Sequence, residues 1–502
     1  MKTGASYLDF YSRAVGIVLN VERFVEVAGT VGSGDASLNP EILGNLPAPG
    51  LEVIRIWFFG FRIVFCRFSN ESLRKFLYRE NGTGDAFLRI KRSISLRIVV
   101  FSGEDRLKFL AGGKESGRCR SLIVAGCLGQ RYKQELLDEI PEADAIIGTG
   151  AWGRIMEAVE ETLKGHRVVI AGKDEALYDE NTPRITTTPS YTAYVKIAEG
   201  CNNRCAFCAI PYIRGDYRSR RIEDICDEVR HLTENGVREV VLIAQDSTEY
   251  GRDLYGAPKL SELLREIVKV PKLQWVRTLY SYPKYFSDEL IETIASEPKI
   301  CKYVDLPLQH AHDAVLRSMR RPDTQEEMRA LIKKLRERIP GVTIRSTFIV
   351  GFPGETDAQY HTLRNFIEEM RLDKVGVFTY SREEGTPAYD MPNQVPEEIM
   401  QERYHDLMSL QCKISEQINQ SLEGKELDVL VEGRDEEQPN ISVGRSYREA
   451  PEVDGQVYVE NDTDSKPGDI VHVRVLQGFT YDIVGERINN GDASEAGKKA
   501  AE

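Results

Sequence analysis

The 502-residue sequence has no long apolar run, and this absence excludes a class of proteins. Because a helix needs roughly eighteen or more consecutive apolar residues to cross a bilayer, we predict no transmembrane helix. The N-terminus also lacks the pattern of a secretory signal, which is a basic segment, an apolar segment and a small-residue cleavage site. We therefore expect a soluble, cytoplasmic protein of about two to four domains.

Cysteine is scarce, with nine residues in the whole chain. An odd number at such low density argues against a disulfide framework and favours reduced thiols, some of them bound to metal. A reducing compartment also suits an oxygen-sensitive metal cluster.

Positive charge is in deficit, with 66 Lys and Arg against 79 Asp and Glu and a net charge of -13. This balance weakens the case for a nucleic-acid partner, because phosphate binding requires a concentration of basic residues. Residues 424–487 alone hold 15 acidic and 7 basic side chains, a difference of -8. A basic protein is the easier partner for such a surface.

Three cysteines at i, i+4 and i+7, namely Cys201, Cys205 and Cys208, are the most informative feature of the sequence. This spacing is typical of ligands that hold three corners of a 4Fe-4S cube and leave the fourth iron open. An open iron can bind the amino and carboxylate groups of S-adenosylmethionine and pass it one electron, which frees an adenosyl radical. We expect Phe207 to pack beside the cluster.

Zinc or a reactive thiol pair is the alternative interpretation of the same cysteines. Zinc sites usually add a second Cys-x-x-Cys pair or nearby histidines, and neither lies close to Cys201. In that case the protein would be an interaction module without catalytic activity.

Short apolar runs alternate with amphipathic segments from residue 194 onward, which predicts repeated βα units. Six parallel strands of this kind make an α/β fold with a partial (βα)6 barrel, and its chemistry is expected at the C-terminal ends of the strands. The cysteine loop follows the first strand directly. We predict strands at 194–198, 239–244, 275–280, 302–306, 343–350 and 374–379, and helices at 222–235, 260–268, 288–296, 324–339 and 358–369.

Several polar residues and glycines fall at those strand ends. Gln245, Gln309 and Glu355 could hydrogen-bond the amino or ribose groups of adenosylmethionine, and Gly351 would let the backbone approach it closely. An ordinary strand-to-helix turn with a capping carboxylate is the alternative for each of them.

Two further groups have competing interpretations. The basic residues Arg214, Arg218, Arg220 and Arg221 could bind a carboxylate of the cofactor or substrate, or form a solvated face before a helix. His310 and the nearby His312 could bind a metal, but hydrogen-bonded structure is the commoner role of such a pair.

After a helix at 397–422 the pattern changes to short strands, which we place at 426–432, 441–445, 455–459 and 470–476. They predict a small antiparallel barrel of the oligonucleotide-binding type. The composition of residues 489–502 predicts a disordered tail.

The segments 199–211, 305–310, 351–356 and 375–387 together resemble the radical-SAM methylthiotransferases. Residues 444–455 are similar to the RimO branch of that family, which modifies ribosomal protein S-twelve. The sister branch, MiaB, modifies an isopentenylated adenosine in transfer RNA and is the alternative assignment. The resemblance covers residues 114–488 and identifies 424–488 as a TRAM domain after a radical-SAM core at 190–422.

The resemblance implies a two-part reaction with two 4Fe-4S clusters and adenosylmethionine as cofactors. The second cluster would be held by three cysteines of an N-terminal α/β domain and would carry the sulfur that is transferred. The product would be a β-methylthio-aspartate. Implied partners are ribosomal protein S-twelve or the small ribosomal subunit, and an electron donor.

The sequence departs from the family pattern in its first 113 residues. Cys127, in the remaining part of the N-terminal domain at 114–175, matches the third ligand of the second cluster. The family's two earlier cysteine segments are absent, and Cys66 has different surroundings that suggest a buried apolar residue. Residues 1–113 could derive from a shifted reading frame or mistaken gene start, or the lineage could have replaced this half-domain.

Overall fold

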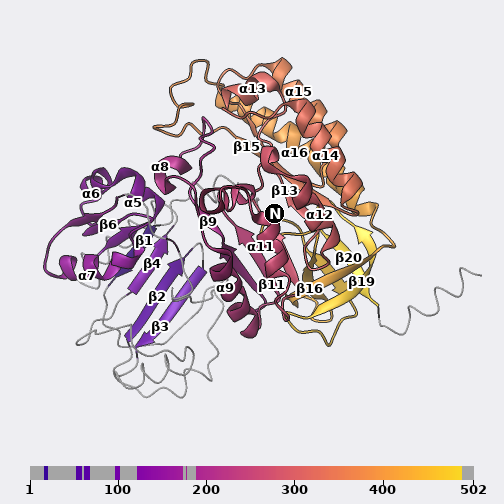
Figure 1. The fold of residues 1–502 in the computed structure, drawn as a ribbon, viewed down its shortest axis with the longest axis horizontal. Coiled ribbons are helices and arrows are strands. Elements are labelled where there is room, and N and C mark those ends of the chain that lie inside the picture. The colour runs from indigo at the N-terminus through magenta and orange to yellow at the C-terminus, as the bar shows by residue number, and fades with distance from the viewer. Residues whose placement is uncertain are drawn as a thin grey trace, which may run out of the picture. The chain divides into compact units, whose positions relative to one another are not determined.

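The computed structural model describes residues 121–172, 177 and 188–488. It also describes the backbone of four strands, β1 (Gly16–Asn20), β2 (Glu52–Phe58), β3 (Phe61–Arg67) and β4 (Arg97–Phe101). These residues belong to two compact units, one within Asp9–Ala176 and the other largely Leu177–Glu502 (Figure 1). The rest of the predicted segment 1–113 and the predicted tail 489–502 lie outside the described residues. No helix in the described ranges is both long and apolar enough to span a membrane.

The first unit contains a five-stranded sheet in the order β4-β1-β5-β6-β7. Its three parallel strands are short apolar runs, β5 (Ile123–Ala125), β6 (Ala145–Ile147) and β7 (Val168–Ile170). Apolar runs without alternation are typical of parallel strands covered on both faces. The connecting helices are α5 (Cys127–Tyr132), α6 (Gln134–Glu139), η1 (Trp152–Arg154) and α7 (Ile155–Leu163).

The second unit begins with six parallel strands that follow one another in chain order, which confirms the predicted partial barrel. They are β8 (Thr192–Lys196), β11 (Glu239–Ile243), β12 (Trp275–Thr278), β13 (Tyr303–Asp305), β14 (Thr343–Val350) and β15 (Lys374–Thr379). The strands form two three-stranded sheets, β8-β11-β12 and β13-β14-β15. A bridge between Val276 and Ile300 and a hydrogen bond from Ser281 N to Asp305 O connect the two sheets.

The first of these strands starts and ends two residues earlier than predicted. The chain changes partners at Ile197, whose N–H binds Ile243 O while its carbonyl accepts from Arg220 N. The predicted end of the strand therefore forms β9 (Ala198–Glu199), which pairs with β10 (Arg218–Ser219) and leads into the cysteine loop.

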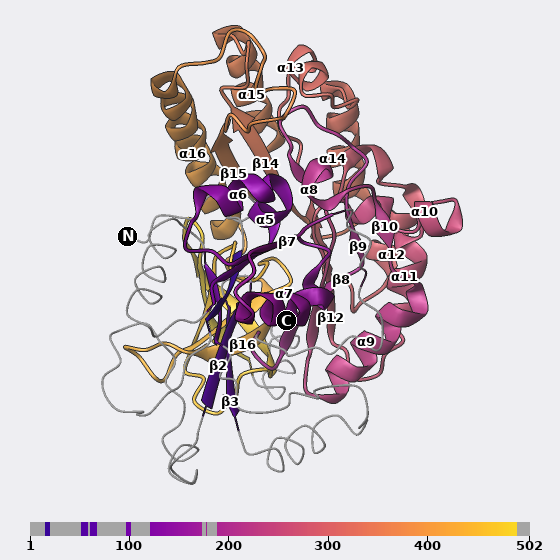
Figure 2. The same cartoon turned by 90° about the vertical axis from the view of Figure 1, so that its left-hand side faces the viewer.

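Five amphipathic helices line one side of the strands and share a continuous apolar core with them (Figure 2). Side-chain caps fix where several begin, including capping boxes at Thr324 and Thr356. The five helices are α9 (Ile222–Glu234), α11 (Leu260–Ile267), α12 (Asp288–Ser296), α14 (Gln325–Arg338) and α15 (Asp357–Met370). Shorter elements are α8 (Ile210–Arg214), η2 (Ser247–Glu249), α10 (Arg252–Tyr255), η3 (Pro283–Tyr285) and α13 (Asp313–Ser318).

Helix α16 (Glu397–Gln420) packs against β15 and leads into a closed barrel in the order β16-β17-β18-β20-β19. Four of the strands were predicted, whereas the fifth, β20, was missed. Four of the five pairings are antiparallel, and β18 pairs with β20 in parallel. The strands are β16 (Glu426–Arg434), β17 (Ser442–Ser446), β18 (Val457–Glu460), β19 (Ile470–Gly478) and β20 (Ile483–Arg487).

Buried ion pairs join this end barrel to the N-terminal half of the parallel strands. Glu239, which is 0% exposed, accepts from Arg277 Nε at 3.0 Å and from Arg445 Nη2 at 2.7 Å. Burial alone would raise the pKa of Glu239, but the two guanidinium charges outweigh it and lower the pKa to about 2. We call Glu239, Arg277 and Arg445 the Glu239 clamp.

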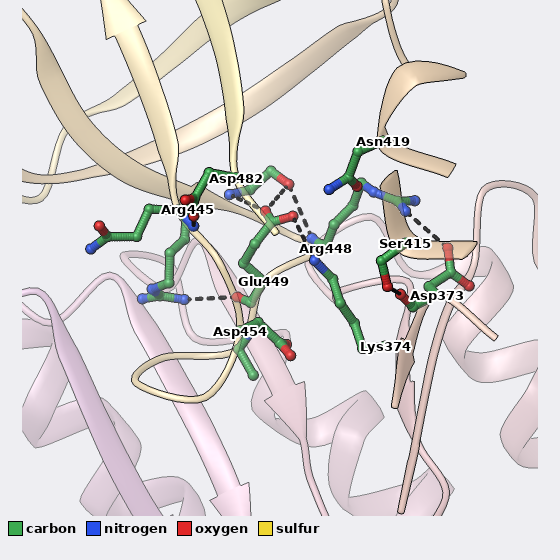
Figure 3. Close-up of polar contacts among 12 residues, drawn as sticks. Asp373, Lys374, Ser415, Asn419, Arg445, Arg448, Glu449, Asp454 and Asp482 are labelled. Carbon is green, nitrogen blue, oxygen red and sulfur yellow. Dashed lines mark hydrogen bonds and ion pairs between the residues drawn. The ribbon is translucent and has the colours of Figure 1, made fainter. Parts of the chain in front are cut away.

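The segment after β17 adds further contacts to the parallel strands (Figure 3). Arg448 binds Asp373 at 2.9 Å, and Glu449 lies 3.8 Å from Lys374. Asp454 accepts from Tyr303 Oη at 2.7 Å. The end barrel thus occupies the N-terminal end of the strands, whereas the cysteine loop follows a strand at the other end.

Candidate functional site

The three predicted cluster ligands lie in one loop between β9 and α8. The loop begins at Gly200, whose φ of 85° and close approach to Asp216 O, 2.2 Å from a Cβ at this position, exclude other residues. Cys201 N then donates to Gly215 O at 3.2 Å, and Cys208 N to Cys205 O at 3.1 Å. The backbone therefore ties the start of the cysteine loop to the end of α8.

Hydrogen bonds from three directions fasten this loop. Asn203 Nδ2 donates to Asp246 Oδ2 at 2.7 Å, and Asp246 in turn caps η2 by accepting from Thr248 N at 3.0 Å. Asn202 Oδ1 accepts from Tyr217 N at 3.1 Å. Ala206 N donates to Met319 O at 2.9 Å, just after α13. The loop is held to β10, to the end of β11 and to the end of α13.

The three thiols are free and lie in mutually close, poorly solvated positions. Burial raises the pKa of Cys201 to about 12 and also raises the pKa of Cys205 and Cys208. The neighbouring thiols act in the same direction on Cys201 and Cys208. Binding of iron must therefore displace protons from this loop.

A 4Fe-4S cube and a single metal ion require different arrangements of their ligands. In the part of the chain that the structure describes, no group of three His, Cys, Asp or Glu side chains converges on one metal position. Thiolates that hold a 4Fe-4S cube each bind a different iron, so they need not converge. The zinc alternative gains no support from this geometry.

Phe207 packs against an apolar cluster at the same end of the barrel. Its neighbours there include Phe352 and Tyr380, whose rings meet edge to face with centroids 5.5 Å apart. The Tyr380 hydroxyl is buried and has no hydrogen-bond partner among the described residues. The sequence analysis did not predict a role for Tyr380, which lies in the segment 375–387 that resembles the radical-SAM methylthiotransferases.

Gln245 and Gln309, two predicted ligand contacts, carry side-chain groups without partners in the described ranges. Gln245 Oε1 is a buried acceptor that receives no hydrogen bond. Gln309 has a φ of 70° and pairs through its backbone with Phe348, leaving its side-chain amide unbonded. An unsatisfied acceptor inside a protein is costly, and a bound donor would remove that cost.

Gly351 and Glu355, two more predicted ligand contacts, make close contacts within the protein. Both Glu355 oxygens are used within the protein, by the Gly351 N–H, by His310 Nε2 at 3.2 Å and by Arg403 Nη1 at 3.2 Å. A Cβ at Gly351 would lie 2.1 Å from Met400 Cγ of α16. These contacts fix the loop after β14, and contact of the two residues with a ligand stays a prediction.

His310 is a structural residue, in agreement with the commoner of its two interpretations. It is 0% exposed, and its Nδ1 accepts from His312 N at 2.9 Å. The proton therefore resides on Nε2, where it is donated to Glu355. Burial lowers the pKa of His310.

The basic residues after the cysteine loop pair with acids of the protein itself. Arg214 binds Glu199 at 3.2 Å, and Arg220 binds Glu228 at 2.6 Å. Arg221 binds Asp224 at 2.6 Å. These ion pairs stabilise the turn into α9, while Arg220 Nε and Nη2 stay buried without a hydrogen-bond partner in the described residues. A carboxylate site and a solvated face both stay predictions.

Arg321, which was not predicted, lies under the cysteine loop and is 4% exposed. Its guanidinium charge acts to lower the pKa of the Cys205 thiol against the larger effect of burial, and it stacks 4.2 Å from the centre of the Tyr282 ring. Nothing local in the sequence marks it, since it lies in a run of charged residues after α13.

Cys127, the predicted ligand of the second cluster, begins α5 directly after β5 and is half-buried. Gly126 before it has a φ of 126°. Cys127 is the one cysteine among residues 121–172 of the first unit. The prediction for the Cys66 side chain lies outside the described residues.

Comparison with known proteins gives two matched domains. Residues 195–367 match the radical SAM superfamily, and residues 424–488 match the TRAM domain. A protein of Desulforamulus reducens named ribosomal protein uS12 methylthiotransferase RimO is 52% identical over 378 residues, which cover 75% of this chain and 85% of the relative. A protein of the same name from Geobacter sulfurreducens is 48% identical over 77% of this chain and 86% of the relative.

The chain belongs to the RimO family of methylthiotransferases. It is a radical-SAM enzyme that transfers a methylthio group, and its cofactors are a 4Fe-4S centre and S-adenosylmethionine. The three free thiols and the unpartnered Gln245 acceptor fit these cofactors. The matched length of 378 residues is close to that of the segment 114–488 in which the sequence resembled the family.

Proposed function

We propose that this enzyme adds a methylthio group to the β-carbon of an aspartate in ribosomal protein uS12, free or in the small ribosomal subunit, in the cytoplasm. The observation that carries this proposal is the 52% identity over 85% of a relative named for that reaction. The acidic end barrel supports it independently, because a basic ribosomal protein is its electrostatic complement.

Cys201, Cys205 and Cys208 would hold the radical cluster, and Phe207 would shield one side of it. When bound, such a cluster and adenosylmethionine supply a radical that removes hydrogen from an unactivated carbon. A base of ordinary strength could not remove a proton from that position. The chain contributes the fastened loop, the unpartnered amides of Gln245 and Gln309 as contacts for adenosylmethionine, and exclusion of water.

Cys127 would provide one ligand of the second, sulfur-donating cluster. Its place directly after a parallel strand puts it at the end of the sheet where such folds bind ligands. Two more thiolates are needed for three-point ligation. In residues 121–172 no second cysteine is present, so those ligands would have to come from elsewhere.

An electron donor is the remaining partner that the proposal requires, because the cluster must take up one electron in each cycle. Transfer RNA is the alternative substrate, as in the MiaB branch. The excess of acidic residues in the end barrel opposes it, since a surface that binds phosphates needs basic residues.

Anaerobic reconstitution with iron and sulfide tests the proposal. We expect about four irons per chain if only the radical site assembles and about eight if both do. Cys205→Ala should lose cleavage of adenosylmethionine, whereas Cys226→Ala, at a half-buried cysteine of α9, should retain it. Full cleavage by Cys205→Ala would contradict the site.

The substrate is tested with small ribosomal subunits and with transfer RNA in parallel reactions. We expect a mass increase on uS12 and none on transfer RNA. Modification of transfer RNA alone would overturn the assignment while leaving the cysteine site intact.

A further inference from the structure

Asp246 connects the cysteine loop to the segment just after β11 through a closed ring of hydrogen bonds. Its Oδ2 accepts from Asn203 Nδ2 at 2.7 Å, and its backbone carbonyl accepts from Tyr217 Oη at 2.7 Å. Tyr217 N in turn donates to Asn202 Oδ1 at 3.1 Å. Because Asn202 and Asn203 are consecutive residues of the cysteine loop, the ring closes on that loop.

The other carboxylate oxygen of Asp246 fixes the backbone that follows β11. Oδ1 accepts from Thr248 N at 3.0 Å, from Thr248 Oγ1 at 2.6 Å and from Glu249 N at 3.3 Å, and so caps η2. Asp246 is 2% exposed and Tyr217 is 4% exposed, so water competes little for these bonds. The side chain of Asp246 is therefore held from two sides, by the cysteine loop and by η2.

Gln245 is the neighbour whose position depends on this ring. Asp246 has an extended backbone, with φ -153° and ψ 101°, so side chains alternate in direction along this segment. Leu242 and Ala244 belong to the apolar core that the helices share with the strands. The alternation places Gln245 on the opposite face of the strand, away from the helices, where its unpartnered Oε1 is the candidate contact for adenosylmethionine.

We propose that Asp246 is a positioning residue for both cofactors of the radical site. Through Asn203 it sets the loop that holds the cluster, and through its own backbone it sets Gln245, so one side chain keeps the two binding positions in register. Both of its carboxylate oxygens are occupied by the protein, so Asp246 is not itself a ligand contact. This inference rests on the proposed function, because it assumes that the cysteine loop holds the radical cluster.

An exchange of the two bonded side chains tests the link to the loop. We expect Asn203→Asp to lower the affinity for iron about tenfold, because two carboxylates then face each other. Adding Asp246→Asn to this variant should restore the affinity, because the pair again has one donor and one acceptor and Asn caps a helix as well as Asp does. Iron retained in the presence of a chelator is the measurement. A double variant no better than Asn203→Asp would overturn the link to the loop.

Binding of adenosylmethionine to the iron-loaded protein tests the link to Gln245. Asp246→Ala should weaken it about fivefold, roughly the contribution of one hydrogen bond. In a Gln245→Leu background the same change should cause no further loss, because Asp246 acts through Gln245. Equal losses in both backgrounds would overturn this link. If Asp246→Ala does not fold, Asp246→Asn takes its place, and parent affinity in that variant would also overturn it.

Asp216→Asn is the matched control for a charge change beside the loop. Asp216 binds Arg204 of the same loop at 2.7 Å, but the side chains of this pair are 74% and 54% exposed. Exposed pairs contribute little, so the affinities for iron and adenosylmethionine should stay those of the parent. A loss as large as that of Asn203→Asp would mean that any altered charge at the loop suffices, and Asp246 would have no special role.

Iron content and substrate separate this inference from the proposed function. A parent protein that binds no iron would overturn both. A parent that modifies transfer RNA and not uS12 would overturn the proposed function and leave the role of Asp246 standing. A parent that modifies uS12, combined with an exchange that restores nothing, would remove the role of Asp246 alone.

Discussion

The two ends of the partial barrel differ in the surroundings of their buried polar groups, although single buried atoms without a hydrogen bond, such as Arg448 Nε and Glu449 Oε1, also occur beside the end barrel. Toward the N-terminal ends, the charges of the Glu239 clamp are paired with opposite charges at 2.7–3.0 Å. At the cysteine end, Gln245, Arg321 and Tyr380 each keep a buried polar atom without a partner in the described residues.

This difference suggests that the clamp residues stabilise the fold and that the residues at the cysteine end bind the cofactors. Paired charges fix one packing arrangement and need no further partner. A buried donor or acceptor without a partner costs free energy, and a bound ligand can remove that cost. Substitutions at the clamp should therefore change stability, and substitutions at the cysteine end should change cofactor binding.

Glu239→Gln should have the largest effect, because it leaves Arg277 buried without its counter-charge and removes one of the two carboxylates, Glu239 and Glu432, that pair with Arg445. We expect a loss of about 3–5 kcal/mol in the free energy of unfolding, measured by chemical denaturation. Glu262→Gln, in an exposed pair with Lys259, is the control and should leave the denaturation midpoint unchanged.

The same variant gives a pH test. The folded-state pKa of Glu239 is about 2 against an ordinary value of 4.5, so its contribution is complete above pH 4.5 and is lost as the pH falls toward 2. The stability difference between parent and Glu239→Gln should shrink over that interval. A difference independent of pH would contradict the charge pairing.

Asn203→Ala should weaken the cysteine end without unfolding the protein. It removes the 2.7 Å bond to Asp246 that fastens the loop, and loss of such a supporting contact typically costs about 10–100-fold in metal affinity or activity. The loss of affinity is measured as the fraction of iron that the protein retains in the presence of a chelator. Asn235→Ala, at an exposed amide after α9, should retain iron like the parent.

Gln245→Leu should separate ligand binding from stability at a single residue. The unpartnered Oε1 disappears, so the free protein should be as stable as the parent or more stable. Adenosylmethionine should bind about tenfold more weakly, because one hydrogen bond is lost. Equilibrium binding and thermal unfolding measure the two effects, and unchanged affinity would exclude Gln245 from the site.

Salt should have the smallest effect. Binding of purified uS12 to the acidic end barrel should weaken a few-fold between about 0.1 and 0.3 M salt, because exposed charges are screened. An acidic ribosomal protein of similar size should show no such dependence. Binding that is indifferent to salt would mean that the end barrel contributes shape rather than charge.

Much of the fold could be predicted because its signals are local. The six strands are short segments rich in β-branched and aromatic residues, and the helices between them carry apolar residues at helical spacing. β14 and β15 were placed at their observed limits. The three cysteines also lie within eight consecutive residues, so the sequence alone was enough to place their loop after the first predicted strand.

The missing parts depend on contacts between distant residues. Gly351 is needed because Met400, 49 residues further on, packs against it. Arg321 looks like one of several surface charges until the fold brings it to Cys205. β20 is five residues long and pairs in parallel with β18, so no hairpin turn connects the pair. Glu355 was predicted as a ligand contact because two of its three partners, His310 and Arg403, lie more than forty residues away in the sequence.

The Glu239 clamp has a consequence for how one aspartate is selected. Because Arg445 of the end barrel is buried against β11 and β12, the end barrel cannot swing away from the strands without exposing unpaired charges. A protein docked on it is presented at a set separation from the cysteine loop. By fixing the distance between the end barrel and the cysteine loop, the clamp would restrict reaction to a residue of the docked protein that lies at that distance from the docking surface.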